Sequence, residues 1–546
     1  MAKKNNNAPR LRFTVNHALV TIYTIAMFSV FPLFLTHYYQ YARRDKFWFF
    51  VVITIAASVP VIALAITQYI QHYQLSKHPS KAKAFYMDPL KLTITDIGML
   101  AFLASNIIST ICATAIADNR GETFKKLFEG SYGRNMGLLM VITMALCYFI
   151  VSRFFFFKKY IIYCMFIGMT VMSFVAILNF YHIDVLGIFA KYQSNQNVLN
   201  NFTSTIGNKN YLSAMITVAL PFSVGLAVAT KDKTLRICAY VSTGLQFMGL
   251  LVATSDGGFL GCFAAFAVML VILSRDLQKL SRFFFCLFVM MLSAKLLWLF
   301  DLAMKGNNKV YTSFSEIFVY NNFIFMLIPI FFGIAAVFDL LIKNPSTKVF
   351  SIGRILFAAS LVIVGLGVLG VVAMFLYYSV IDTESKLTGF ARFFRFNDRW
   401  GTHRGFFWIK SFEIFKEFNF REVLFGSGPD TFYNVFEPYF DELRKYGDSS
   451  TNAAHNVYIN YLITIGVTGV LSYLFFLGTA VVNGIRNSLR NPIALMSIGV
   501  IVAYVVQDIV NIANPVNTPW LIMFIALSES VKLRANSADK LAEEGF

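Results

Sequence analysis

The sequence has little charge for its length, and this lack excludes the largest class of proteins. Only 14% of its 546 residues are Asp, Glu, Lys or Arg, whereas soluble globular domains carry about a quarter. Hydrophobic residues make up 57% and aromatic residues 16%, and the mean hydropathy is +0.61. A water-facing fold could not cover so much apolar surface, so the composition indicates an integral membrane protein.

Paired cysteines and a basic domain are also missing. The six cysteines lie in or beside apolar runs, without a C-x-x-C pair or a Cys/His cluster of zinc-binding spacing, so we expect neither disulfides nor a metal site. They are Cys112, Cys147, Cys164, Cys238, Cys262 and Cys286. The formal net charge is +18, but the basic residues are scattered among short loops. This distribution is typical of the cytoplasmic loops of helical membrane proteins, and we expect no nucleic-acid partner.

Long apolar runs recur along the chain. Because a bilayer core of about 30 Å needs roughly 20 apolar residues per helix, they predict an all-α polytopic membrane bundle of about fourteen transmembrane helices. The first run follows a basic segment without a cleavage site, so we expect it to be retained. The expected starts are near Asn16, Phe47, Asp96, Met136, Tyr160, Asn210, Thr234, Gly257, Arg282, Asn321, Arg354, Asn456, Asn491 and Pro515.

The basic residues predict the orientation of this bundle. With the N-terminus in the cytoplasm, the short basic connections KDKTLR, SRDLQKLSR and NGIRNSLRN lie inside. The connections AKYQSNQNVLNNFTSTIGNKN and TSDGG lie outside and are poor in Lys and Arg. Two outward connections do not fit, because YARRDK is basic and DNRGETFKKLFEGSYGRN is mixed. The balance still predicts that both termini are cytoplasmic.

One hydrophilic connection is much longer than the others. We divide the chain into a transmembrane bundle of about eleven helices (1–380), a large extracytoplasmic loop (381–455), about three C-terminal transmembrane helices (456–534) and a cytoplasmic tail (535–546). A loop of more than about 15 residues is unusual unless it is functional or disordered. This loop is rich in Phe, Trp and Tyr, which argues against disorder. We therefore expect the functional site there.

Apolar residues recur at helical spacing within the loop segment HRGFFWIKSFEIFKEF. They are Trp408, Ile409, Phe412, Phe415 and Phe418. The pattern predicts an amphipathic helix along the membrane surface, and ordinary packing against the bundle is compatible with it. The later LFGSGPDTF lacks the Lys-Ser/Thr ending of a P-loop, so we interpret Gly426 and Gly428 as turn formers.

Four arginines stand among aromatic residues just ahead of this helix. Arg392 and Arg395 could equally well bind anionic lipid headgroups. Arg399 and Arg404 flank the turn-like WGTH and are better placed to point at a fixed ligand. A guanidinium suits phosphate because its planar fork of donors makes bidentate, charge-assisted hydrogen bonds.

His455 and Asn456 stand directly before the apolar run that follows the loop. A neutral imidazole can take a proton from an attacking hydroxyl near neutral pH, although a histidine at a membrane interface can also merely cap a helix. The arginines of the same loop, and aromatic residues able to hold a lipid-linked substrate, favour a base combined with a phosphate clamp.

Polar residues inside two apolar runs have several explanations. Lys295 is near Asp301 in sequence, so the two could pair, and reaching outward to the interface accounts for the lysine equally well. Asp508 and Asn511 lie one helical turn apart near an outer end. They could orient His455 or an arginine, or line a hydrated vestibule.

Three stretches together resemble the superfamily of O-antigen ligases and O-antigen polymerases, which are bacterial membrane glycosyltransferases. STIGNKNYLSAMITVALPF is similar to its Gly-Asn-x-Asn helix start and contains Asn208 and Asn210. GTHRGFFWIKSFEIFKEFNFREVLFGSGPDTF is similar to its Arg-x-x-x-Trp element, here Arg404 and Trp408, with a Gly-x-Gly turn. AHNVYINYLITIGVTGVL is similar to its His-Asn helix start with a Gly-x-x-Gly segment.

The resemblance implies a fold of the lipid-dependent glycosyltransferase (GT-C-like) type and a transfer reaction at the outer face of the bacterial cytoplasmic (inner) membrane. The donor would be a glycan on undecaprenyl pyrophosphate and the acceptor a sugar hydroxyl of a glycolipid or growing polysaccharide, with no cofactor or metal. By carry-over, His455 deprotonates or orients the acceptor hydroxyl, while Arg404, with Arg399, neutralises the departing pyrophosphate. The supporting residues would be Asn456, Trp408, Asn208, Asn210 and Asp508.

One turn departs from the family pattern. Many members carry Ser-Arg-Gly at the outer turn between two mid-chain helices, but here the turn reads ATSDGGFLG, with Asp256 in place of the arginine. Arg399 or Lys209 could supply the missing cation, or the donor differs.

Other functions stay open at this point. A lipid-linked oligosaccharide flippase could also have about fourteen helices and basic cavities, but such transporters tend to show two related halves and short loops, and no internal repeat is evident here. A non-catalytic partner in polysaccharide assembly is a further alternative. Ligases, polymerases and protein O-glycosyltransferases share one chemistry and differ in their acceptors. The sequence alone does not distinguish among these three activities.

Overall fold

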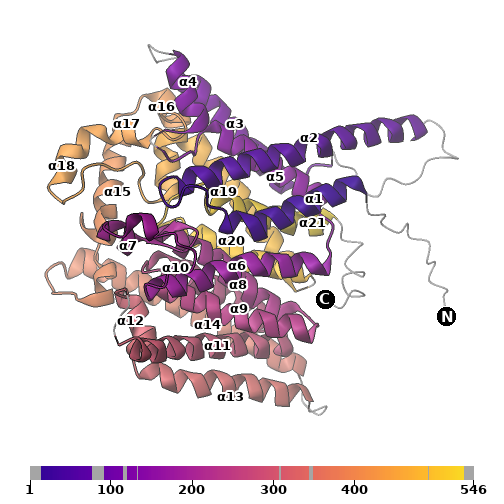
Figure 1. The fold of residues 1–546 in the computed structure, drawn as a ribbon, viewed down its shortest axis with the longest axis vertical. Helices are drawn as coiled ribbons and strands as arrows, with labels where there is room; N and C mark the ends of the chain where they lie inside the picture. The colour runs from indigo at the N-terminus through magenta and orange to yellow at the C-terminus, as the bar shows by residue number, and fades with distance from the viewer. Residues whose placement is uncertain are drawn as a thin grey trace.

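The computed structural model consists almost entirely of helices. It describes residues 14–76, 91–114, 120–131, 133–305, 309–343, 349–489 and 491–533. Within these ranges the long helices run side by side (Figure 1), and the only strands are a two-residue pair, β1 (Phe202–Thr203) and β2 (Gly207–Asn208), which is antiparallel. The predicted all-α membrane bundle is confirmed.

Ten helices in the described ranges are long and apolar enough to cross a membrane, and four shorter apolar helices accompany them. Every predicted start lies within five residues of one of these helices; the offset from Phe47 to Ala42 is one of the largest. The long helices are α1 (Val15–Ile25, continued by η1, Ala26–Val30, and η2, Phe31–Leu33), α2 (Ala42–Ser76), α3 (Ile94–Thr114), α6 (Lys159–Phe180), α8 (Lys209–Ala229), α9 (Lys233–Val252), α11 (Leu277–Ala303), α13 (Phe323–Lys343), α14 (Val349–Leu376) and α19 (Val457–Ser488). The shorter helices are α5 (Leu138–Phe154), α10 (Gly257–Leu273), α20 (Pro492–Gln507) and α21 (Thr518–Leu533).

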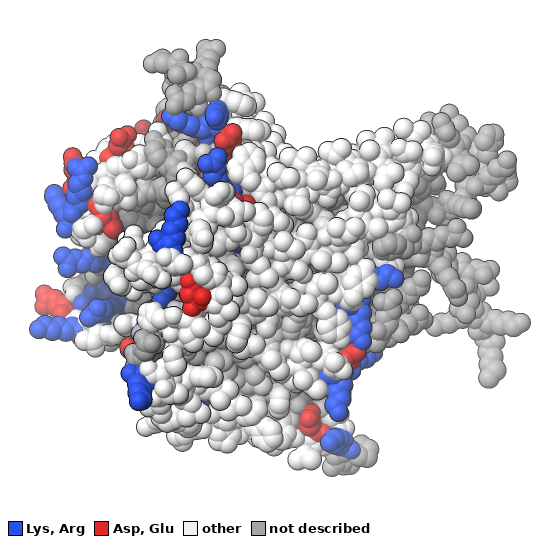
Figure 2. Space-filling view, viewed as in Figure 1, with Lys and Arg blue, Asp and Glu red and all other residues white. Residues whose placement is uncertain are grey.

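Shorter elements gather at one end of the bundle, on the left in Figure 1, which we call the loop face. The long loop contributes η5 (Gly389–Phe394), α15 (Trp400–Glu417), α16 (Phe420–Phe425), α17 (Phe432–Phe436) and α18 (Phe440–Arg444), and other connections contribute α4 (Arg120–Glu129), α7 (Gln196–Asn201) and α12 (Ser313–Tyr320). Charged side chains collect at the loop face and at the opposite end, with an uncharged band between them (Figure 2). A band of this kind is what a bilayer core requires.

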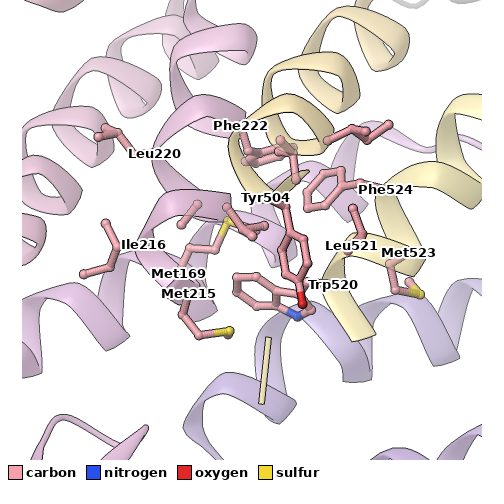
Figure 3. Close-up of a cluster of buried hydrophobic side chains, with 14 of the residues drawn as sticks. Met169, Met215, Ile216, Leu220, Phe222, Tyr504, Trp520, Leu521, Met523 and Phe524 are labelled. Carbon is pink, nitrogen blue, oxygen red and sulfur yellow. The ribbon is translucent and has the colours of Figure 1, made fainter. Parts of the chain in front are cut away.

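Helix α8 lies at the centre of the bundle. The apolar stretch of α8 is 100% buried, whereas the apolar stretch of α14 is only 6% buried and faces outward. Side chains of α8, α20 and α21 interlock in the core, among them Phe222, Tyr504 and Phe524 (Figure 3), and the Trp520 indole donates to the Met27 carbonyl at 2.9 Å. This packing fixes the N-terminal end of α8, which reaches the loop face.

The intramembrane lysine Lys295 has neither of the predicted explanations. Its ammonium donates to the carbonyls of Val319 (2.8 Å) and Asn321 (2.9 Å), and so satisfies the free carbonyls at the end of α12. Asp301 instead accepts hydrogen bonds from the hydroxyls of Tyr181, Tyr311 and Tyr320. The expected pairing of Lys295 with Asp301 is wrong. The lysine ammonium binds the carbonyls at the C-terminal end of α12, where the helix dipole favours a positive charge.

Helix α15 has two apolar faces rather than one. Phe406, Phe407 and Ile414 are buried against a small core of the loop that includes Phe432 and Phe436. On the other side, Ile409 and Phe412 are exposed, as contact with a membrane surface requires. The sequence pattern identified the helix, but of the five residues assigned to its membrane face only Ile409 and Phe412 are exposed. Trp408, Phe415 and Phe418 pack against the loop core, which is formed by residues distant in sequence.

Candidate active site

His455 is positioned by the backbone that leads into α19. It adopts φ +52°, in the left-handed region. Asn456 begins the helix, because its side-chain oxygen accepts the N–H of Ile459 at 3.0 Å. The side-chain oxygen of Asn460 accepts the N–H of Ala454 at 3.3 Å. These caps hold the imidazole in one direction without using either of its nitrogens.

The imidazole of His455 is held by α15 and open to a pocket. The Phe407 ring stacks on it, with centroids 5.6 Å apart and planes 22° apart, while the Trp408 indole donates to the Ala454 carbonyl at 3.0 Å. Neither imidazole nitrogen bonds to any residue that the structure describes. The ring lines an open pocket of about 370 Å³ together with Tyr433, Ser450, Thr451 and Asn452.

Arg404 begins the regular part of α15, after a tight turn. Residues 401–403 are all left-handed, with φ of 56°, 61° and 68°, so the turn predicted at WGTH is confirmed. At Gly405 a Cβ would lie 1.9 Å from the Asn397 carbonyl oxygen, so only glycine fits. The turn ends the preceding segment and directs Arg404 toward the bundle.

The Arg404 side chain is partly buried, and its guanidinium is unpaired among the described residues. It forms no hydrogen bond or ion pair within the described part of the chain, although Asp256 attracts it. Burial lowers the pKa of Arg404 to about 10, so it stays charged at neutral pH. A desolvated guanidinium with free donors is suited to an anionic ligand.

The charges of Arg404 and of a second arginine, Arg134, contribute to the protonation state of His455. Burial and the two positive charges lower the pKa of His455 to about 3. The imidazole is therefore neutral at pH 7, the form that can accept a proton.

Arg134 was not identified from the sequence. It lies just before α5, and its guanidinium donates to the carbonyl (3.2 Å) and side-chain oxygen (3.1 Å) of Asn452 and to the Ala513 carbonyl (3.1 Å). Its Nε lies 3.8 Å from the Asp430 carboxylate. Arg134 thus ties three loops together beneath the pocket.

The glycine-rich turn after α16 packs against α19 and does not form a phosphate cradle. The N–H groups of Ser427 and Gly428 donate to the carbonyls of Ile463 (3.1 Å) and Thr464 (2.8 Å). A Cβ at Gly426 would lie 2.3 Å from the Thr464 backbone, and Gly426 has φ +72°. The turn-former interpretation of Gly426 and Gly428 is confirmed, and the turn places Asp430 beside Arg134.

The two asparagines of the Gly-Asn-x-Asn stretch do not contact His455 but stabilise elements near the site. Asn208 caps α8 by accepting the N–H of Asn210 at 2.8 Å. The Asn210 side chain accepts the Ser255 hydroxyl at 2.8 Å, which fixes the turn that carries Asp256. Burial raises the pKa of Asp256, and its Oδ1 has no hydrogen-bond partner among the described residues.

Two other predicted residues, Arg399 and Asp508, do not contact His455. Arg399 is exposed, and the charge it presents acts on Tyr446 rather than on His455. Asp508 does not orient His455: its carboxylate accepts the Tyr473 hydroxyl at 3.0 Å, and its carbonyl accepts the N–H of Val457 at 2.9 Å. Asp508 caps the C-terminal end of α20, and its hydrogen bond to Val457 supports the start of α19.

Arg395, for which lipid binding was considered, stabilises the loop itself. Its guanidinium donates to the carbonyls of Tyr378 (3.2 Å), Ser385 (2.7 Å) and Asp382 (2.7 Å). Arg392 is exposed and donates only to the Leu387 carbonyl among the described residues, at 3.4 Å. Arg404 is therefore the arginine of this group that reaches the histidine.

Comparison with known families now adds to this geometry. The family model described as O-antigen ligase matches residues 323–474, a segment that runs from α13 into α19 and contains both Arg404 and His455. A search of curated proteins found no match. The family match confirms the resemblance stated from the sequence and indicates an O-antigen ligase-like membrane protein.

Proposed function

From the O-antigen ligase match of residues 323–474, we propose that this protein is a membrane glycosyltransferase. It moves a glycan from undecaprenyl pyrophosphate to a sugar hydroxyl of a glycolipid or growing surface polysaccharide. The observation that carries this proposal is the arrangement at the loop face. There, a neutral imidazole without a hydrogen bond to any described residue lines an open pocket, and it feels the charge of the partly buried Arg404 guanidinium, which is unpaired in the same part of the chain.

Each group has a defined part in the transfer. The acceptor oxygen attacks the anomeric carbon of the donor sugar, and the bond from that carbon to the phosphate oxygen breaks with its electron pair on the leaving pyrophosphate. His455 takes the proton of the attacking hydroxyl. Arg404 stabilises the negative charge that develops on the leaving oxygen, as a positioned cation does in a water-poor site.

The two groups are coupled through charge. Burial, together with the charges of Arg404 and Arg134, holds the pKa of His455 at about 3, which makes a neutral but weak base. A bound pyrophosphate offsets both positive charges, and opposite charge nearby favours the protonated imidazole. Donor binding therefore raises the basicity of His455 when the acceptor arrives.

We place the loop face outside the cytoplasm. The short connections at the opposite end carry Lys231, Lys233, Arg275 and Lys279, as cytoplasmic loops do. The N-terminal end of α1 also lies at that opposite end (Figure 1). A lipid-linked donor would then reach the pocket from the bilayer, and a hydrophilic acceptor would arrive from outside.

The test is release of undecaprenyl pyrophosphate by purified protein in nanodiscs supplied with lipid-linked glycans from a bacterial host. We expect release by the wild type and its loss in His455→Asn, a change that suits the left-handed backbone because asparagine tolerates it. His182→Asn is the matched control, since His182 is also left-handed (φ +60°) and exposed away from the pocket.

Product length then separates a polymerase from a ligase. Wild-type protein that releases no undecaprenyl pyrophosphate, even with glycolipid acceptors added, contradicts the transferase. In that case a lipid-flipping assay in vesicles tests the transporter alternative.

A further inference from the structure

Arg43, the second residue of α2, is a partly buried cation that lacks an acidic partner. Its Nη1 donates to the Tyr211 hydroxyl at 3.1 Å. Its Nε is fully buried and has no partner among the described residues, and no carboxylate there forms an ion pair with it. Placing a charge in such surroundings is costly unless something neutralises it.

Arg43 belongs to the surroundings of the proposed active site, although it is distant in sequence. A Cβ on Gly133 would lie 3.0 Å from the Arg43 Nη2, so the guanidinium lies directly over the residue that precedes Arg134. Burial lowers the pKa of Arg134 and the charge of Arg43 adds to this effect, whereas burial raises the pKa of Asp430 and the charge of Arg43 opposes that rise. Arg134 in turn acts on His455.

The N-terminal end of α8 is linked to Arg43 by a hydrogen bond and to Arg404 through the turn that carries Asp256. Tyr211, which holds Arg43, follows Asn210, and Asn210 bonds to Ser255 in the turn that carries Asp256. Asp256 attracts Arg404. The two arginines thus approach one end of α8 from different elements, α2 and α15.

The three arginines differ in what they can still bind. Both terminal nitrogens of Arg134 are bonded to carbonyl or amide oxygens, and its Nε faces Asp430. Arg404 has all its donors free, and Arg43 keeps its Nε and Nη2 free of hydrogen bonds among the described residues. Arg134 is a framework residue, while Arg43 and Arg404 can each take an anion.

We propose that Arg43, positioned by Tyr211, binds the lipid-side phosphate of the donor, while Arg404 serves the phosphate that leaves the sugar. The inference rests on the proposed function. The assignment of the two phosphates follows from α2, which begins at this site and exposes Trp48, Val52 and Ile55 to the membrane. The lipid chain of a donor held by Arg43 can leave along that surface.

The test measures binding rather than transfer. Farnesyl pyrophosphate and farnesyl monophosphate are titrated into the full-length protein in nanodiscs, for the wild type and Arg43→Gln. Loss of hydrogen bonds to a charged group predicts that Arg43→Gln weakens farnesyl pyrophosphate binding about tenfold or more. The monophosphate carries only the lipid-side phosphate that is assigned to Arg43, so its binding should weaken as well.

Arg44→Gln is the matched control, because Arg44 is the next residue, carries the same charge and is exposed. Tyr211→Phe removes the hydroxyl that holds Arg43 and should give a smaller loss in the same direction. If Arg43→Gln does not fold, Arg43→Lys keeps the charge and should still weaken the binding of both farnesyl phosphates, because it lacks the fork of donors.

Equal binding of farnesyl pyrophosphate by Arg43→Gln and Arg44→Gln overturns the inference. The assay does not require catalysis, so the two proposals can fail separately. If binding depends on Arg43 but the protein transfers no glycan, the anion site at Arg43 is supported and the transferase function is contradicted.

Discussion

Buried charges occur in two regions of this molecule, and the protein satisfies them differently. Within the helix packing, three residues further along α2 than Arg43, the Lys46 ammonium is buried and donates to the carbonyls of Phe31, Pro32 and Phe34. Asp96 forms an ion pair with Arg153 at 2.5 Å and accepts the Tyr148 hydroxyl at 2.7 Å. These charges have their partners within the fold, as burial in an apolar medium demands.

At the loop face the charges are left incomplete. Arg404 has no hydrogen-bond partner in the described part of the chain, and buried side-chain atoms of Arg43 and Asp256 also lack one there. The same physical cost applies in both regions, so charged groups left incompletely paired at the loop face are candidates for binding a ligand. The comparison therefore separates charges that stabilise the fold from charges that we propose bind a substrate.

The largest expected effect tests the loop-face side of this comparison. His455→Asn should lower the rate of glycan transfer about 1000-fold, because a positioned general base contributes roughly 100- to 10,000-fold. The melting temperature should stay close to that of the wild type, since the imidazole nitrogens bond to no described residue. Single-turnover transfer and a thermal melt in nanodiscs measure both. Full activity in this variant would remove His455 from the mechanism.

Arg404→Gln comes next, with an expected loss of about 100-fold or more in kcat, the usual effect of removing a group that stabilises a developing oxyanion. Its stability should be nearly unchanged, because Arg404 is partly exposed and forms no hydrogen bond or ion pair with a described residue. Arg392→Gln removes an exposed arginine of the same loop and is the control. A similar loss in both variants would mean that net charge of the loop matters, and not this guanidinium.

Asp96→Asn tests the other side of the comparison. It leaves Arg153 without its buried counterion, and the free energy of unfolding should fall by about 3 kcal/mol, while activity per folded molecule is retained. Asp232→Asn is the control, because the Asp232–Lys159 ion pair is partly exposed and such pairs contribute about 1 kcal/mol or less. Thermal unfolding in matched nanodiscs distinguishes the two. Equal shifts would show that burial of the pair is not what matters.

Local patterns in the sequence were sufficient for the helices and for part of the site. Apolar run length located the membrane helices, and the WGTH turn and the His-Asn helix start located Arg404 and His455. Arg134 and Arg43 were missed because they reach the site from connections far away in sequence. A signal did exist: the two outward connections that broke the charge rule, YARRDK and DNRGETFKKLFEGSYGRN, are the ones that contain Arg43 and Arg134. Basic residues on the outer side could have been interpreted as ligand-binding candidates.

The smallest expected effect concerns the protonation of His455. In the free protein its pKa of about 3 keeps the imidazole neutral down to pH 5. Bound pyrophosphate offsets the charges of Arg404 and Arg134, so the pKa of His455 should rise, and Arg404→Gln should raise it as well by removing one cation. Nitrogen-15 NMR of histidine-labelled protein, titrated with and without farnesyl pyrophosphate, measures the shift. Because a raised pKa protonates the base at acid pH, kcat should fall on acidification at a higher pH than kcat/KM, which reports the free enzyme. A His455 pKa near 6.5 in the free protein, unmoved by pyrophosphate, would show that the arginines do not control this base.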